Sequence, residues 1–84
     1  MAEHTIDINC TIDKSIQVKI TAATREDAEA IASMMDNDGK YDEKWSNASE
    51  RNHDTYILDA QGNETYPNTD GFEWSEDGES VVRI

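Results

Sequence analysis

The sequence SIQVKITAATREDAEAIASMM, residues 15–35, holds a strand and a helix in direct succession. Residues 15–22 alternate polar and apolar side chains, which is the period-two pattern of a strand buried on one face. Thr24 then has the side chain of a helix N-cap, because its hydroxyl can accept the backbone N–H of Asp27. The helix that follows carries a narrow apolar stripe made of Ala28, Ile31, Ala32 and Met35. Together these patterns predict a helix that lies on one face of a sheet.

A second alternating segment, residues 4–13, precedes this unit and is predicted as its antiparallel partner. Cross-strand neighbours share a face, so a three-residue loop is preferred over a two-residue loop, which would set the two apolar rows on opposite faces. The expected pairs are Ile12 with Ile16, Cys10 with Val18, and Ile8 with Ile20.

The helix is expected to end near Met35. Gly39, or alternatively Asn37, is a candidate for the left-handed residue that commonly follows a helix. The polar residues 41–53 come next, and we predict a short second helix or an ordered loop there, anchored to the core edge by Tyr41 and Trp45.

Four short strands complete the predicted chain, at residues 55–59, 64–66, 72–75 and 80–84. The first two are joined by turn residues 61–63, and the last two form a hairpin. Residues 1–84 are therefore expected to form a single α+β domain, an antiparallel β-sheet packed by one main α-helix in the order β-β-α-β-β-β-β.

The register of the last hairpin follows from matching its apolar faces. A three-residue loop, 77–79, keeps the apolar side chains together and adds one cross-strand charge pair. The expected pairs are Trp74 with Val82, Phe72 with Ile84, and Glu73 with Arg83.

Carboxylates dominate the composition, with 19 Asp plus Glu against 7 Lys plus Arg and a net charge of −12. Direct binding of nucleic acid or of a membrane surface is not expected, because both require a basic patch. The expected partner is a basic protein surface, such as one that normally holds DNA or RNA. The start of the chain lacks the basic and apolar regions of a signal peptide, and no apolar run approaches the roughly 20 residues of a membrane span. We therefore expect a cytoplasmic protein.

No group of residues predicts catalysis, a metal site or a cofactor. Cys10 lies in an apolar row and is expected to be a core thiol. His4 and His53 have no cysteine partners with zinc-ligand spacing. The acidic residues around Gly39 fail the calcium-loop pattern, which places Glu at the twelfth position, here Trp45. No nucleophile, base and oxyanion donors can be assembled, so an enzyme is not expected.

The acidic pattern remains as the candidate site. Between Arg51 and Arg83 the chain has eight carboxylates and no Lys or Arg. Alternate side chains of a strand lie about 6.6–6.8 Å apart, similar to successive phosphates, so these carboxylates can imitate a phosphate row. A solvated face that only confers solubility, and salt adaptation, are the alternatives. The candidate partner-binding residues are Asp36, Asp38, Asp42, Glu43, Asp54, Asp59, Glu64, Asp70, Glu73, Glu76, Asp77 and Glu79.

Residues 16–35 resemble a strand-then-helix module of small phage and mobile-element proteins, with the pattern V-x-V-x-A-x-T/S-x-E/D-E/D-A-E-x-I-A. The matching residues are Val18, Ile20, Ala22, Thr24, Glu26, Asp27, Ala28, Glu29, Ile31 and Ala32. In size and acidity the chain is also similar to anti-CRISPR and anti-restriction proteins, many of which mimic DNA or plug a basic channel. The resemblance implies an inhibitor of a nucleic-acid-processing complex in a bacterial host cell. The alternative is a non-enzymatic structural or assembly module, either monomeric or homodimeric through a sheet edge or the Trp45 region.

Overall fold

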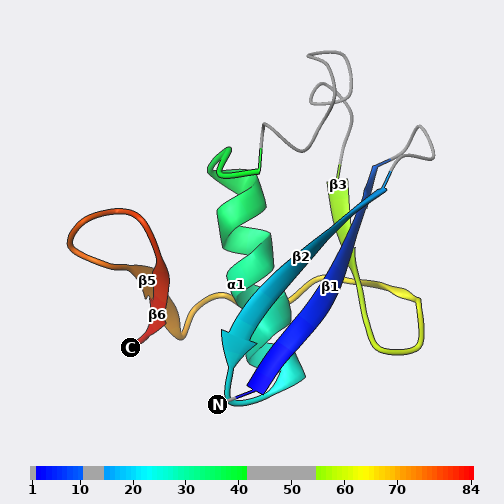
Figure 1. The fold of residues 1–84 in the computed structure, drawn as a ribbon, viewed down its shortest axis with the longest axis horizontal. Helices are drawn as coiled ribbons and strands as arrows, with labels where there is room; N and C mark the ends of the chain where they lie inside the picture. Colours follow the sequence, from blue (N-terminus) through cyan, green and yellow to red (C-terminus); the bar gives the residue numbers. More distant parts are fainter. Residues whose placement is uncertain (1, 11–14, 42–54) are drawn as a thin grey trace.

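The computed structural model describes residues 2–10, 15–41 and 55–84 (Figure 1). It contains one helix and six strands in these residues. The elements are β1 (Ala2–Cys10), β2 (Ser15–Ala22), α1 (Arg25–Asn37), β3 (Thr55–Leu58), β4 (Glu64–Thr65), β5 (Phe72–Trp74) and β6 (Val81–Arg83). The predicted α+β class and the order of the elements are confirmed.

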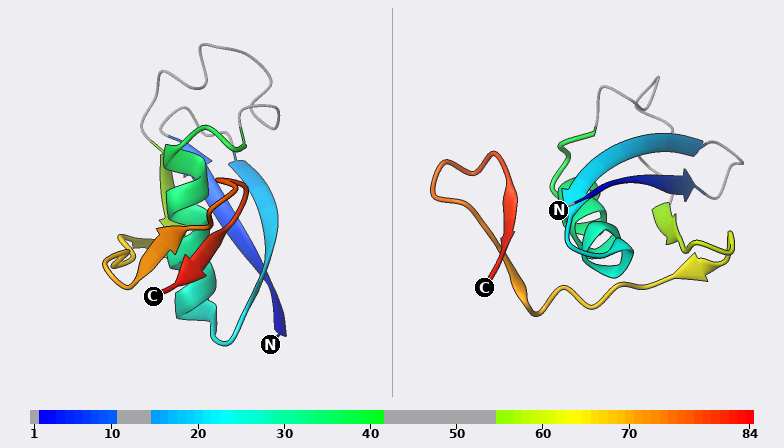
Figure 2. Two further views of the ribbon diagram at one scale, coloured as in Figure 1. Left: turned by 90° about the vertical axis from the view of Figure 1, so that its left-hand side faces the viewer. Right: turned by 60° about the horizontal axis from the view of Figure 1, so that its bottom comes forward.

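The strands form two separate antiparallel sheets in place of the single sheet that we expected. One sheet has four strands in the order β2-β1-β3-β4, and the other is the β5–β6 hairpin. Helix α1 lies between the two sheets, with the hairpin on the side away from β1 and β2 (Figures 1 and 2). Helix α1 therefore packs apolar side chains against both sheets.

The predicted faces of β1 and β2 are confirmed, but their predicted register is wrong by four residues. Val18 pairs with Ile6 instead of Cys10, and Ile16 pairs with Ile8. Any shift by an even number of residues keeps the same side chains on the same face, so alternation alone does not decide among such registers. The observed register pairs β2 along its whole length. Residues 11–14, which include Ile12, lie outside the described residues.

Helix α1 begins and ends with the capping groups that its sequence predicts. The hydroxyl of Thr24 accepts a hydrogen bond from the backbone N–H of Asp27 at 3.1 Å. Two acidic residues, Glu26 and Asp27, occupy the first turn, where they favour the helix dipole. The helix continues to Asn37, and Gly39 follows with φ of 80°, the left-handed conformation that suits glycine.

The main core lies between α1 and the four-stranded sheet. The apolar rows of β1 and β2 meet one face of the helix and Ile57 of β3. Its buried members are Ile6, Ile8, Cys10, Val18, Ile20, Ala22, Ala28, Ala32, Tyr41 and Ile57. The expectation that Cys10 is a core thiol is confirmed.

A smaller apolar cluster joins the other side of α1 to the hairpin. Ala30 of the helix packs against Phe72 and Val81, and Trp74 lies at the margin. The strand prediction for residues 55–59 is confirmed by β3, and the turn at residues 61–63 by Gly62, which has φ of 82°. Of the segment 41–53, only Tyr41 belongs to the described residues. It is buried, as expected, and its hydroxyl donates to the sulfur of Met35.

The predicted register of the last hairpin is wrong by one residue. Trp74 pairs with Val81 and Phe72 pairs with Arg83, while Glu73 faces Val82. The connection is residues 76–79, closed by a 2.8 Å hydrogen bond from the N–H of Ser75 to the carbonyl of Ser80. A one-residue shift exchanges the two faces, so Val81 is buried and Val82 points outward. The expected Glu73–Arg83 pair is absent from this register.

Candidate partner-binding surface

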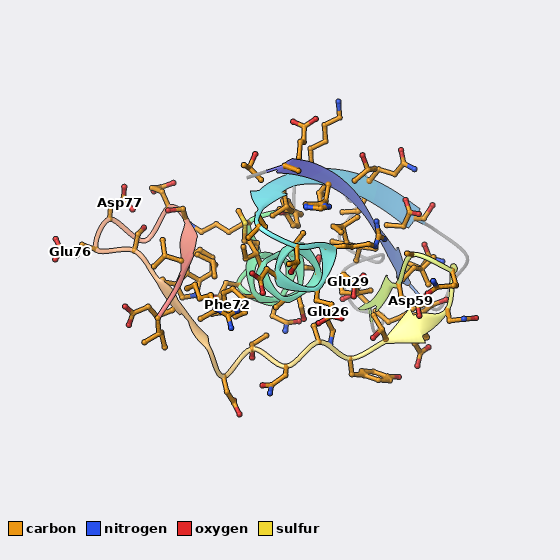
Figure 3. The ribbon with its side chains drawn as sticks, turned by 90° about the horizontal axis from the view of Figure 1, so that it is seen from below. Glu26, Glu29, Asp59, Phe72, Glu76 and Asp77 are labelled. Atoms are coloured by element: carbon orange, nitrogen blue, oxygen red, sulfur yellow. The ribbon has the colours of Figure 1, made fainter. Side chains whose placement is uncertain are left out.

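Three of the predicted acidic residues lie together on the loop that joins β5 to β6. We call Glu76, Asp77 and Glu79 the acidic tip. All three are exposed. Figure 3 shows Glu76 and Asp77 at the far end of the hairpin, pointing away from α1. The acidic tip therefore stands off the body of the protein.

Side-chain hydrogen bonds within the loop hold its shape. The carboxylate of Asp77 accepts from the hydroxyl of Ser75 and, at 3.0 Å, from the backbone N–H of Glu79. The hydroxyls of Ser75 and Ser80 lie 3.1 Å apart across the base of the loop. Gly78 has φ of 71°, and its N–H donates to the carbonyl of Ser75 at 2.9 Å. The loop is thus closed by its own polar groups.

The electrostatic surroundings favour the charged form of Asp77. The hydrogen bond from Ser75, the backbone N–H of Glu79 and the positive charge of Lys40 lower the pKa of Asp77 below its usual value. The side-chain carboxylates of Glu76 and Glu79 make no hydrogen bond or ion pair with the described part of the chain. Their carboxylates are therefore available to an external cation.

The base of the hairpin is attached to the body by two cationic contacts. The guanidinium of Arg83 lies 5.2 Å from the ring centroid of Phe72 and 2.8 Å from the carboxylate of Asp27. The ammonium group of Lys40 lies 5.5 Å from the ring centroid of Trp74. These contacts, together with the Ala30 cluster, fix where the acidic tip is held relative to α1.

Two other predicted acidic residues, Asp36 and Asp59, make hydrogen bonds within the fold. Asp36 is only 3% exposed, and its carboxylate accepts a hydrogen bond from the hydroxyl of Thr55 at 2.5 Å. It does not present its charge to a partner, so its assignment to the surface is corrected. Asp59 accepts the backbone N–H groups of Gln61 and Asn63, each at 2.9 Å, and so shapes the turn before β4.

The remaining predicted acidic residues do not join the acidic tip into one row. Asp38, Glu64, Asp70 and Glu73 are exposed, but Asp59 lies at the opposite end of the molecule from the tip (Figure 3). Glu64 contacts the hydroxyl of Tyr66. The described carboxylates therefore do not form one row, and of these residues Glu73, on β5, shares the hairpin with the acidic tip. Asp42, Glu43 and Asp54 lie outside the described residues.

A groove of about 700 Å³ runs between the first half of α1 and residues 59–71. Its charged lining residues are Arg25, Glu26, Asp27, Glu29, Asp59 and Arg83. Sequence reasoning did not single out this groove, because the i, i+4 spacing of Arg25 and Glu29 was its only local signal.

Arg25 is the central residue of the groove and is fully engaged. Its guanidinium binds Glu29 at 3.0 Å and also donates to the backbone carbonyls of Thr5, at 3.0 Å, and Leu58, at 3.3 Å. The side chain thus ties α1 to β1 and β3. Arg83, the other cation among the described residues that line the groove, is paired with Asp27, so neither arginine is left unpaired for an anionic substrate.

Sequence reasoning also missed two exposed apolar side chains on the hairpin. Val82 and Ile84 were expected to face the core, and they lie on the outer face instead. Both apolar neighbours Val81 and Val82 fit a strand pattern, so the sequence carried no signal for which of the two would be buried.

Other kinds of site find no support in the described residues. Among residues 2–10, 15–41 and 55–84, no three His, Cys, Asp or Glu side chains are grouped so that they could hold a metal ion. In the same part of the chain, α1 is neither long nor apolar enough to span a membrane.

No protein-family model, curated protein or solved structure matches the chain.

Proposed function

We propose that this protein is an inhibitor of the anti-CRISPR type, which binds the basic nucleic-acid-binding surface of a host defence complex in the bacterial cytoplasm. Its acidic residues meet Lys and Arg side chains that otherwise contact phosphates. DNA or RNA is then blocked by steric and electrostatic competition. No catalytic step and no cofactor are part of this mechanism.

The observation that carries the proposal is the acidic tip. Three carboxylates are held on a closed loop at the end of a hairpin, away from the body of the protein. A preformed loop of this kind can enter a basic cleft with little loss of conformational freedom. The net charge of −12 adds long-range attraction, which accelerates association with a basic partner at low salt.

The cations of the described residues do not neutralise the acidic tip. Arg25 binds Glu29, and Arg83 binds Asp27. Lys40 lies over Trp74 and acts on Asp77, while Glu76 and Glu79 remain without an ion pair in the described part of the chain. Arg25 and Arg83 are thus engaged within the fold, and the carboxylates of Glu76 and Glu79 are left for a partner.

The test is a capture experiment with two charge variants. The tip variant is Glu76→Lys with Glu79→Lys, and it retains Asp77 because that residue shapes the loop. The matched control is Glu3→Lys with Glu26→Lys, which makes the same change in net charge elsewhere on the surface. Each tagged protein is bait in nuclease-treated bacterial lysate, at low and then moderate salt.

We expect the wild-type protein to retain one nucleic-acid-binding complex that is released by salt and blocked by added DNA. The control variant should retain the same complex, and the tip variant should not. Equal retention by the tip variant and the wild type would contradict the role of the tip. Absence of any salt-sensitive basic partner from a lysate that contains CRISPR and restriction systems would contradict the function.

One observation favours a second candidate, a homodimeric assembly module. Strand β2 is an edge strand of eight residues that contains no Pro and no carboxylate. Such an edge can pair with a second copy of itself, with little charge repulsion along the strand. Sedimentation distinguishes the two functions, because a tight dimer without a basic partner would favour the assembly module.

A further inference from the structure

The outer face of the β5–β6 hairpin carries an exposed apolar pair. Val82 is 41% exposed and Ile84 is 76% exposed. Ile84 continues the β6 ladder, because its N–H donates to the carbonyl of Gly71 at 2.8 Å. Residues two apart on an extended strand point to the same side, so both side chains face away from α1. We call Val82 and Ile84 the outer patch.

Neither residue of the outer patch belongs to an apolar cluster of the described part of the chain. The inner face of the hairpin already fills the contact with α1 through Phe72, Trp74 and Val81. Among the described residues, the exposed large hydrophobic side chains are Tyr66, Val82 and Ile84, and two of these three are neighbours on one strand. Scattered exposed apolar residues are normal, but adjacent ones on a regular strand are typical of a contact surface.

Carboxylates border the outer patch. Glu73 is exposed directly across the ladder from Val82, and the acidic tip follows at the end of the same hairpin. Protein–protein interfaces commonly have an apolar centre within a polar rim. The hairpin has this arrangement on the side of Glu73 and the acidic tip, where the rim is negatively charged.

The charge of the rim determines which partner fits. A second copy of this chain would bring Glu73 and the acidic tip of one copy against those of the other, which is unfavourable. Nucleic acid and anionic membranes would meet the same repulsion. A protein surface with positive charge removes this repulsion and leaves the apolar pair to be buried.

We infer that the outer face of the hairpin docks on a protein surface in which an apolar recess lies beside Lys and Arg side chains. This inference rests on the proposed function, since it concerns the partner of the same hairpin. It adds that the acidic tip alone does not account for affinity. Burial of the outer patch supplies a part of the binding free energy that salt does not screen.

Two synthetic peptides of equal length and equal lysine content serve as probes. One alternates Lys with Leu, and the other alternates Lys with Ser. Their dissociation constants for the full chain are measured by titration calorimetry at moderate salt, and backbone amide shifts show where each peptide binds. The matched variant is Val82→Thr with Ile84→Thr, which keeps β-branched side chains and replaces a methyl group by a hydroxyl at Val82.

We expect the Lys–Leu peptide to bind about tenfold more tightly than the Lys–Ser peptide, with amide shifts at Val82 and Ile84. The variant should bind both peptides with the affinity that the wild type shows for the Lys–Ser peptide. Equal binding of the two peptides to the wild type overturns the inference and leaves the proposed function standing. Binding of neither peptide overturns both.

A second copy as the occupant is tested separately by sedimentation of the wild type alone. A dimer that the Val82→Thr, Ile84→Thr variant abolishes would overturn the inference, because the outer patch would then be a self-contact. The peptide comparison on the wild-type protein does not depend on how well the variant folds. The amide spectrum of the variant confirms that its hairpin is intact.

Discussion

Arg83 of β6 and Asp27 of α1 lie 56 residues apart in the sequence, and their charged groups are 2.8 Å apart. This ion pair ties the hairpin to the first turn of the helix. The same guanidinium lies over the ring of Phe72, so one side chain makes both contacts.

The Arg83–Asp27 pair is expected to stabilise the docked hairpin weakly, because 63% of the Arg83 side chain is exposed to solvent and salt screens such pairs. A double-mutant cycle with Arg83→Gln and Asp27→Asn should give a coupling free energy of about 0.5 kcal/mol. Urea unfolding at low and high salt measures it. A coupling that does not change with salt would contradict an exposed electrostatic contact.

Arg25→Met should destabilise the protein by about 2 kcal/mol, since it leaves the Glu29 carboxylate without its cation. Glu29 is only 8% exposed, so water compensates poorly. The control is the double variant Arg25→Met with Glu29→Leu, which removes the buried charge and should recover part of the loss. Equal stability of the wild type and Arg25→Met in denaturant unfolding would contradict a stabilising role of Arg25 toward Glu29 and toward the carbonyls of Thr5 and Leu58.

The register of the hairpin predicts opposite results for two neighbouring valines. Val81→Thr should cost about 1–2 kcal/mol, because it places a hydroxyl against Ala30 and Phe72. Val82→Thr, on the exposed face, should change stability by less than about 0.5 kcal/mol. Thermal or urea unfolding of the two variants compares them directly. The reverse order would support the register in which Val82 is buried.

The shape of the acidic tip is expected to depend on pH through Asp77. Its pKa is lowered from the ordinary 3.8 in the folded protein. The stabilisation is therefore present above pH 3.8 and is lost as the pH falls through the lower, folded pKa. Amide shifts of Gly78 and Glu79 should follow this titration, and Asp77→Asn should abolish it. A midpoint above the ordinary value would contradict the hydrogen bonds from Ser75 and Glu79.

The elements that sequence predicts well here are those with strong periodicity and local caps. The alternation of residues 15–22 and the Thr24 cap both appear as expected. The registers failed for two different reasons. The alternating pattern is compatible with every even shift between β1 and β2. In β6, Val81 and Val82 are adjacent and both apolar, so the sequence does not show which of them faces the core. For β6 the contact that decides is between Val81 and Ala30 of α1, which are far apart in the sequence.

At the candidate site, too, features with a local signal were predictable and features that depend on distant residues were not. The hairpin carboxylates are acidic residues beside turn signals, and they were predicted as surface charges from the sequence. Asp36 looked equivalent, but its hydroxyl partner, Thr55, lies 19 residues away in the sequence. Only the folded chain brings that donor to the end of α1, so burial of this carboxylate has no local signal.

Strand β1 comes first in the sequence, yet it lies between β2 and β3 in the sheet. Ile8 pairs with Ile16 on one side, which is a local contact, and with Ile57 on the other, which is distant in the chain. The β1–β2–α1 unit can therefore assemble early, and β3 must close the sheet late, because the entropy of the intervening loop opposes that pairing. Substitutions at Ile57 should then accelerate unfolding much more than they slow folding, with φ-values near zero. On this order of events, β1 is already in place when β3 pairs with it, and β4 is then added beside β3.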